Sequence, residues 1–212
     1  MKKIFNVRTM SEVAIFATLG YVLNLFSDVY SKTFLPNGGA IGIAMICILI
    51  IAYRRGGTAA LMVGLIMAIF DIVDGCYAIA ADWWKAMLQV VLDYGVAFPL
   101  VAMAGLFKKK FDNALTIGQK SKYIIYGSLL GGFCRLVAHY LSGILFWSDG
   151  MLWDVGGPYI YSLLYNAAYI VPSIILCISL MLLMLHKWPQ ILIPEDMQYE
   201  SRNNVKEQSN EK

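Results

Sequence analysis

Long apolar stretches separated by short polar ones run through most of the chain. A helix needs about 20 predominantly apolar residues to cross the hydrocarbon core of a bilayer. By that measure the pattern predicts six membrane-spanning helices, near residues 9–29, 40–53, 57–75, 84–107, 121–146 and 160–186. Turn-forming residues separate several of these stretches: Pro36-Asn37-Gly38-Gly39, Arg54-Arg55-Gly56-Gly57, Asp112-Asn113 and Gly156-Gly157-Pro158. The predicted fold is an all-α integral membrane bundle, in which the span at 40–53 is short.

The predicted helices lie within residues 1–190, which we expect to form a single six-helix transmembrane domain. Beyond Pro194 the chain becomes wholly polar. Such a segment has too little apolar surface to offset the entropy lost on folding. Residues 191–212 are therefore predicted to be a disordered tail.

The orientation of the bundle follows from the charges of its loops, because Lys and Arg accumulate in the short cytoplasmic loops of membrane proteins. The N-terminus and alternate loops carry Lys2, Lys3, Arg8, Arg54, Arg55, Lys108, Lys109, Lys110, Lys120 and Lys122. The opposite loops are poor in cations and carry Asp28, Asp74, Asp82, Asp149 and Asp154. Both termini, and with them the polar tail, are therefore predicted to be cytoplasmic.

Composition supports a multi-pass membrane protein and narrows its chemistry. Hydrophobic residues make up 59% of the 212 and charged residues 15%, with a mean hydropathy of +0.63, far more apolar than a soluble domain requires. The net charge of +3 is too small and too dispersed to indicate nucleic acid as a partner. The chain has only two histidines, and its four cysteines stand singly in apolar surroundings, so neither a metal centre nor a disulfide framework is predicted.

The clearest candidate chemistry lies in the fifth predicted helix. Arg135, His139, Gly143 and Trp147 recur at every fourth residue, which places them along one face of an α-helix. Ionisable groups at membrane depth are costly unless they face protein or a water-filled cavity, and by default they mark functional sites. We therefore expect this face to line a cavity.

Residues of neighbouring helices are predicted to reach the same depth. Asp93 of the fourth helix lies level with His139, and Tyr161 and Asn166 of the sixth helix fall in the same outer half. The end of the third helix brings Asp71 and Asp74 there, and the end of the first brings Asn24. The inner halves hold few such groups, which favours an outward-facing pocket over a continuous pore. A carboxylate, an imidazole, an amide and several aromatic faces suit a small, flat, partly cationic heteroaromatic ligand.

Each of these residues also has a purely structural interpretation. Asp93 suits a structural ion pair, and His139 suits a hydrogen-bonded core histidine. Trp147 suits the aromatic belt at a membrane surface, and Gly143 suits close packing of two helices. Asn166 must find partners for its amide wherever it is buried. The residues alone leave these alternatives open.

Motifs spread over nearly the whole chain, up to about Pro189, follow one another in a specific order: Asn6-Val7-Arg8, Glu12-Val13-Ala14, Tyr53-Arg54-Arg55-Gly56, Asp93-Tyr94-x-Val96-Ala97, Ala104-Gly105-Leu106-Phe107, Arg135-x-x-x-His139-x-x-Ser142-Gly143-x-x-Phe146-Trp147 and Tyr161-Ser162-Leu163-x-Tyr165-Asn166. Their order and spacing resemble those of the thiamine-specific substrate-binding components, or S components, of the bacterial energy-coupling factor (ECF) vitamin transporters.

This resemblance implies a protein of the bacterial cell membrane that captures thiamine from outside the cell. It implies no cofactor and no catalytic chemistry, and delivery through a separate transmembrane coupling subunit and two ATPase subunits. The chain itself has no P-loop motif, so any ATP-driven step needs such a partner. By resemblance, the substrate-binding residues are Asp93 beside the thiazolium cation, Tyr94, His139, Trp147, Tyr161 and Asn166 around the rings, Gly143 for clearance, and Arg135 at the hydroxyethyl or phosphate end.

The chain departs from the family pattern at three places. Some members have glutamate where this chain has Asp93, so the carboxylate here has a shorter reach. Some have tryptophan and glutamate before the second helix, where this chain has Gly38 and Gly42, so a lid contact is expected to be absent or replaced. The family's Ala-x-x-x-Ala motif for docking the coupling subunit reads Ala14-x-x-x-Thr18, whose small side chains suit either docking or packing within the bundle.

Two other function classes compete with a coupled binding subunit. One is a solitary secondary transporter in which Asp93 and His139 relay protons, although no inverted repeat supports it. The other is an intramembrane enzyme in which His139 acts as base with Ser142 or Asp93. No G-x-S-x-G or H-E-x-x-H motif is present, so a non-enzymatic function is favoured.

Overall fold

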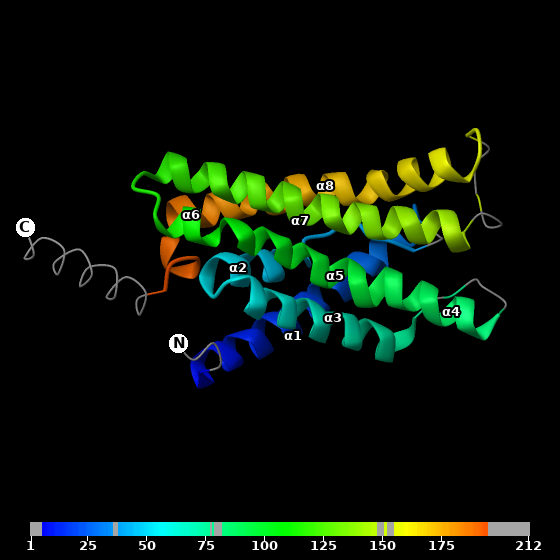
Figure 1. Cartoon of the computed structure of the whole chain (residues 1–212), viewed down its shortest axis with the longest axis horizontal. Helices are drawn as coiled ribbons and strands as arrows, with labels where there is room; N and C mark the ends of the chain where they lie inside the picture. Colours follow the sequence, from blue (N-terminus) through cyan, green and yellow to red (C-terminus); the bar gives the residue numbers. More distant parts are fainter. Residues whose placement is uncertain are drawn as a thin grey trace, which may run out of the picture.

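The protein is a bundle of long helices lying roughly side by side (Figure 1). The structure is a computed structural model and describes residues 6–35, 38–76, 78, 82–147, 151 and 155–194. Four of the long elements are regular α-helices: α1 (Val7–Ser31), α3 (Gly57–Gly75), α7 (Ile117–Phe146) and α8 (Pro158–Lys187). The described residues contain no β-strand, which confirms the all-α prediction.

The fifth long element is helical from Trp83 to Asp112 but changes its helix type along the way. It begins as α4 (Trp83–Val90), widens into the π-helical segment η1 (Val91–Val96), and returns to α-helix in α5 (Ala97–Leu100). It then tightens into the 3₁₀-helical segment η2 (Val101–Phe107) before ending as α6 (Lys108–Asp112). The hydropathy pattern predicted one uniform helix at 84–107.

Helices α1 and α7 begin earlier than the hydropathy pattern predicted, because side-chain caps extend them into polar sequence. The Asn6 side chain accepts a hydrogen bond from the Thr9 backbone N–H at 2.7 Å, and the Thr116 side chain accepts one from Gln119 at 3.2 Å. Such caps satisfy backbone donors that a helix start leaves without partners. A window that scores apolar residues alone does not detect these first turns.

The predicted span at 40–53 is wrong in its length. Helix α2 (Ile46–Arg54) has nine residues, which at 1.5 Å per residue reach about 14 Å, roughly half of a hydrocarbon core. Every residue from Ile46 to Tyr53 is buried, so α2 is a core helix of the bundle. Among the described residues, five helices are long and apolar enough to cross a membrane: Val7–Ser31, Gly57–Gly75, Trp83–Asp112, Ile117–Phe146 and Pro158–Lys187.

Residues 40–45 do not join α2, because side chains of other helices satisfy their backbone groups. Ser31 Oγ accepts from the Ile41 N–H at 3.2 Å, and Ser173 Oγ accepts from the Gly42 N–H at 2.9 Å. The Tyr30 hydroxyl donates to the Ile41 carbonyl. Irregular backbone at membrane depth is tolerated only where protein or a water-filled cavity supplies its partners. Polar side chains of α1 and α8 supply them here.

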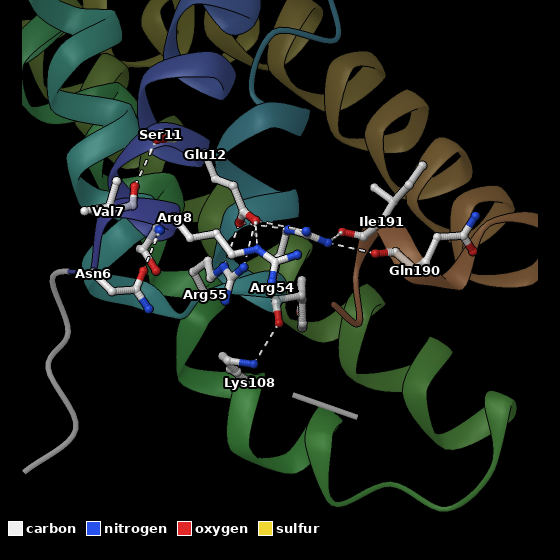
Figure 2. Close-up of polar contacts among 12 residues, drawn as sticks. Asn6, Val7, Arg8, Ser11, Glu12, Arg54, Arg55, Lys108, Gln190 and Ile191 are labelled. Atoms are coloured by element: carbon white, nitrogen blue, oxygen red, sulfur yellow. Dashed lines mark hydrogen bonds and ion pairs between the residues drawn. The ribbon is translucent and has the colours of Figure 1, made fainter. Parts of the chain in front are cut away.

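A cluster of charged side chains joins the start of α1 to the end of α2 (Figure 2). The Glu12 carboxylate accepts two hydrogen bonds from Arg54, at 2.9 and 3.0 Å, and two from Arg55, at 2.6 and 2.7 Å. Arg54 Nη1 also donates to the carbonyls of Gln190 and Ile191 at 2.8 and 2.9 Å. This Glu12 cluster, formed by Glu12, Arg54 and Arg55, therefore also holds the turn η4 (Pro189–Ile191) that follows α8.

The remainder of the predicted polar tail, residues 195–212, lies outside the described residues. Residues up to Pro194 pack on the bundle, and Leu192 is fully buried. In Figure 1 the beginning of α1 and the end of α8 lie toward the same end of the bundle.

Glu12→Gln should destabilise the protein, because it leaves two guanidinium groups without a counter-charge. The three side chains of the Glu12 cluster are only 14%, 15% and 7% exposed. Hydrogen bonds to charged groups contribute about 1.5–3 kcal/mol, so the thermal unfolding midpoint of the detergent-purified chain should fall by several degrees.

A matched control is Asp82→Asn, which breaks an exposed ion pair with Lys85 whose side chains are 53% and 46% exposed. Exposed pairs contribute less than about 1 kcal/mol. Equal changes in the midpoint for the two variants would contradict a stabilising role for the Glu12 cluster.

Candidate substrate-binding site

A cavity of about 570 Å³ lies among all five long helical elements. Asn24 and Asp28 enter it from the end of α1, whereas Glu12 lies near the start of that helix. Side chains from α3, η1, α7 and α8 complete the wall, together with residues 38–40 of the connection between α1 and α2. Its volume lies in the range of pockets that bind small molecules.

The eight residues predicted to bind substrate all line this one cavity. They come from η1, α7 and α8, and one of them, Trp147, is the C-cap residue that follows α7. The eight residues are Asp93, Tyr94, Arg135, His139, Gly143, Trp147, Tyr161 and Asn166. The four-residue spacing on α7 therefore does mark a cavity-facing stripe. Ligand binding by these residues stays a prediction.

Asp93 and His139 form the polar centre of the wall. Asp93 Oδ1 lies 3.3 Å from His139 Nδ1, and the two side chains are 15% and 13% exposed. The His139 ring meets Tyr169 edge-on, with centroids 5.9 Å apart. Within the described part of the chain, His139 Nε2 has no hydrogen-bond partner. The pair thus presents a carboxylate and one further ring nitrogen for interactions with a ligand.

The α8 wall is aromatic and internally hydrogen-bonded. Tyr161 and Tyr165 stack with centroids 5.6 Å apart and an interplanar angle of 26°. Asn166 Nδ2 donates to the Ser162 carbonyl at 2.8 Å, while its Oδ1 accepts from the Tyr169 hydroxyl at 2.7 Å. The buried Asn166 amide therefore finds partners in the protein, and it fixes the position of the Tyr169 ring.

Arg135 lies in the cavity wall against an aromatic ring. Its guanidinium carbon is 4.3 Å from the centroid of Phe98, a cation–π contact. Arg135 Nε is buried and has no hydrogen-bond partner among the described residues. A basic group held in this way remains able to donate to a ligand acceptor.

The charges around the cavity are unequal. Among the described residues, its lining holds the four carboxylates Asp28, Asp71, Asp74 and Asp93 but only two basic side chains, Lys32 and Arg135. In a site shielded from water, such an excess favours a cationic ligand. The aromatic surfaces favour a ligand with planar rings.

Comparison with known proteins identifies the family. The sequence model described as "Thiamine transporter protein (Thia_YuaJ)" matches residues 10–193. The chain belongs to this thiamine transporter protein family. It is similar to "Thiamine transporter ThiT" of Bacillus subtilis (strain 168), with 33% identity over 185 residues that cover 85% of this chain and 92% of the relative.

Two further comparisons agree with this family. "Thiamine transporter ThiT" of Lacticaseibacillus paracasei is 30% identical over 156 residues, covering 72% of this chain and 76% of the relative. The solved structure of ThiT from Listeria monocytogenes matches with a TM-score of 0.76 and 25% identity, covering 89% of this chain and 98% of that chain. Membership confirms the resemblance to thiamine-specific S components, a multi-pass bacterial membrane protein, and a transporter rather than an enzyme.

Sequence reasoning missed part of the site of this thiamine transporter family member. Asp28 served only as a loop charge that set the orientation, yet it lines the cavity with Asp71 and Asp74, which were expected in the same outer half. Asp71 is buried and accepts a hydrogen bond from Asn24 at 3.3 Å. The position of Asp28 at the end of the first predicted helix indicated its depth, but no pattern indicated that it faces the same space as His139.

The connection at residues 38–40 contacts α8 through its backbone. The Tyr165 hydroxyl donates to the Gly38 carbonyl at 2.9 Å. A Cβ on Gly39 would fall against the ring of Tyr169, so only glycine allows this close approach. Gly42 is held through its N–H by Ser173.

Gly143 allows α7 to approach α8 closely. A Cβ at this position would collide with the Ser162 hydroxyl and lie 3.4 Å from Asn166 Nδ2. The Ser162 hydroxyl donates to the Tyr140 carbonyl at 2.9 Å, so it cannot turn away without breaking that bond. Gly143 therefore serves helix packing while it also lines the cavity.

Gly143→Ala should lower the free energy of unfolding by about 1–3 kcal/mol, the usual cost of overpacking a closely packed contact. The matched control is Gly118→Ala in the first turn of α7, where the nearest atom to a new Cβ is Thr116 Oγ1 at 4.0 Å. Because alanine favours helix over glycine, Gly118→Ala should leave stability unchanged or raise it by up to about 1 kcal/mol. Thermal unfolding of both variants decides the point, and a stable Gly143→Ala variant would rule out tight packing here.

Proposed function

We propose that the cavity is the binding site for thiamine and that the protein captures this vitamin outside the cell. The observation that carries the proposal is the excess of carboxylates in a cavity with aromatic walls. Thiamine combines a permanently cationic thiazolium ring with a planar aminopyrimidine, so its charge and shape match both features. The names of the two curated relatives support the same substrate.

Within this proposal, Asp93 supplies the counter-charge for the thiazolium ring. His139 lies next to it and presents Nε2 to the ligand. Arg135 donates to the hydroxyethyl or phosphate end. The rings are enclosed by Tyr94, Gly143, Trp147, Tyr161 and Asn166.

The cavity is proposed to face outward, with both termini in the cytoplasm. Alternate loops carry most of the basic residues, and the Glu12 cluster brings Arg54 and Arg55 to the end of the bundle remote from the cavity. That distribution is what the preference of Lys and Arg for cytoplasmic loops predicts.

Delivery is proposed to depend on a separate transmembrane coupling subunit and two ATPase subunits, as in ECF transporters. The supporting surface is on α1, where Ala14 and Thr18 are exposed and so do not pack within the bundle. The Thr18 hydroxyl donates to the Ala14 carbonyl at 3.0 Å, so this face offers a small side chain without an unsatisfied donor. A flat, small-residue face permits close approach of another helix.

A solitary proton-coupled transporter is the alternative. The observation that favours it is the Asp93–His139 pair, whose two titratable groups lie 3.3 Å apart in the cavity wall. The two modes share the same binding site and differ in what drives release of thiamine into the cell.

Asp93→Asn should weaken thiamine binding by at least about tenfold, because contacts to charged groups contribute about 1.5–3 kcal/mol. The measurement is a titration of the purified chain in detergent, followed by quenching of its tryptophan fluorescence. Asp112→Asn is the matched control, since Asp112 pairs with Lys108 at 2.9 Å at the far end of the same long helix. Wild-type affinity in Asp93→Asn would remove Asp93 from the site.

Uptake of radiolabelled thiamine separates the two modes of delivery. If the coupled mode operates, vesicles that contain only this chain should bind but not accumulate thiamine, and co-expression with a coupling module should make accumulation depend on ATP. Accumulation by the chain alone that collapses with the proton gradient would establish the solitary alternative instead.

A further inference from the structure

We infer that Pro99 is a positioning residue for the substrate site: it maintains the π-helical turn that directs Asp93 and Tyr94 into the cavity. This inference rests on the proposed function and adds a residue that does not line the cavity to the residues that determine affinity. Pro99 is buried and is one of four residues in the short helix α5.

The first observation is where the helix widens. The π-helical segment Val91–Val96 contains both Asp93 and Tyr94, and these two neighbours in sequence both line the cavity. The widened turn changes the angle between successive side chains from the roughly 100° of a regular α-helix, so it sets the directions in which Asp93 and Tyr94 leave the backbone. A π-helical turn holds one residue more than an α-helical turn, and such turns occur frequently at functional sites.

The second observation is a chemical cause for the widening. Pro99 has no backbone N–H, so it cannot donate to the carbonyl of Gly95, four residues earlier. Its ring would also press on that carbonyl in a regular α-helix. Widening the turn before Pro99 relieves the clash. Gly95 belongs to the widened segment, where its lack of a side chain leaves the backbone free to adapt.

The third observation is that α3 fixes Pro99 in place. A Cβ on Gly64 would lie 2.8 Å from Pro99 Cα, 2.9 Å from Pro99 N and 3.0 Å from the Phe98 carbonyl carbon. Backbone therefore packs on backbone here. The next residue toward the cavity, Phe98, carries the ring beneath Arg135. Because this point is held, the turn adjusts on the Asp93 side of Pro99.

Helix α8 offers an internal comparison. Pro172 lies inside α8, six residues after Asn166, just as Pro99 lies six residues after Asp93. Yet α8 is a regular α-helix from Pro158 to Lys187. Proline alone therefore does not widen a helix in this bundle, and Pro172→Ala is a matched control at the same distance from a cavity residue.

The experiment compares thiamine affinity in the full-length, detergent-purified chain for the wild type, Pro99→Ala, Pro99→Val and Pro172→Ala. Alanine and valine both restore the N–H but differ in volume, and the Gly64 contact involves only backbone atoms of residue 99. Pro99→Ala should weaken binding by about ten- to a hundredfold, the range for a lost contact with a charged group, while Pro172→Ala should stay within about twofold of wild type. Thermal unfolding is measured on every variant.

A rescue distinguishes positioning from general destabilisation. Asp93→Glu lengthens the carboxylate arm by one methylene, so it should recover affinity about threefold or more when added to Pro99→Ala, and should not do so when added to Pro172→Ala. Recovery of affinity without recovery of the unfolding midpoint supports the inference.

Other outcomes overturn the inference in distinguishable ways. A wild-type chain that does not bind thiamine overturns the proposed function and this inference together. A wild-type chain that binds, with Pro99→Ala equal to Pro172→Ala or with no rescue by Asp93→Glu, overturns the positioning role alone. Failure of both Pro99 variants to fold, while Pro172→Ala folds, assigns Pro99 to folding and likewise overturns it.

Discussion

The constraint on which the whole structure depends is that a hydrocarbon solvent offers no hydrogen bonds. Every polar backbone group within the membrane must find its partner inside the protein. Regular helices satisfy these backbone groups for most of the described chain, and the irregular segments need side-chain partners instead. The irregular residues 40–45 take their hydrogen-bond partners from Tyr30, Ser31 and Ser173. Non-helical backbone therefore occurs where neighbouring helices carry polar side chains that can bond to it.

The same constraint shapes the cavity. Several polar side chains that line it also hold other parts of the wall: Asn166 fixes Tyr169, Tyr165 holds the Gly38 carbonyl, and Asp71 holds Asn24. Side chains fixed by such bonds retain one geometry without a ligand, which lowers the entropy lost on binding. Arg135 Nε and His139 Nε2 are exceptions, and both belong to the stripe on α7.

Sequence patterns predicted much of this molecule, and the failures have physical reasons. The period of four on α7 depends only on helix geometry, so Arg135, His139, Gly143 and Trp147 could be assigned to one face without a structure. Hydropathy overestimated α2, because an apolar run reports burial and does not distinguish a span from a short core helix. The contribution of Asp28 depends on how α1 rotates against the bundle, which no local pattern records. The widened turn at Val91–Val96 depends on the contact of Pro99 with Gly64 of another helix, and Pro172 shows that proline by itself does not predict it.

The Glu12 cluster also has a consequence for the order in which the chain assembles. Glu12 and Arg54 are 42 residues apart, so their ion pair can form as soon as the first two helices have left the ribosome. The partners of Arg54 Nη1, at Gln190 and Ile191, are 136 and 137 residues further along and are made much later. Arg54 therefore gains its partners in η4 only after α8 has been made, and η4 then packs against a contact between two much earlier parts of the chain.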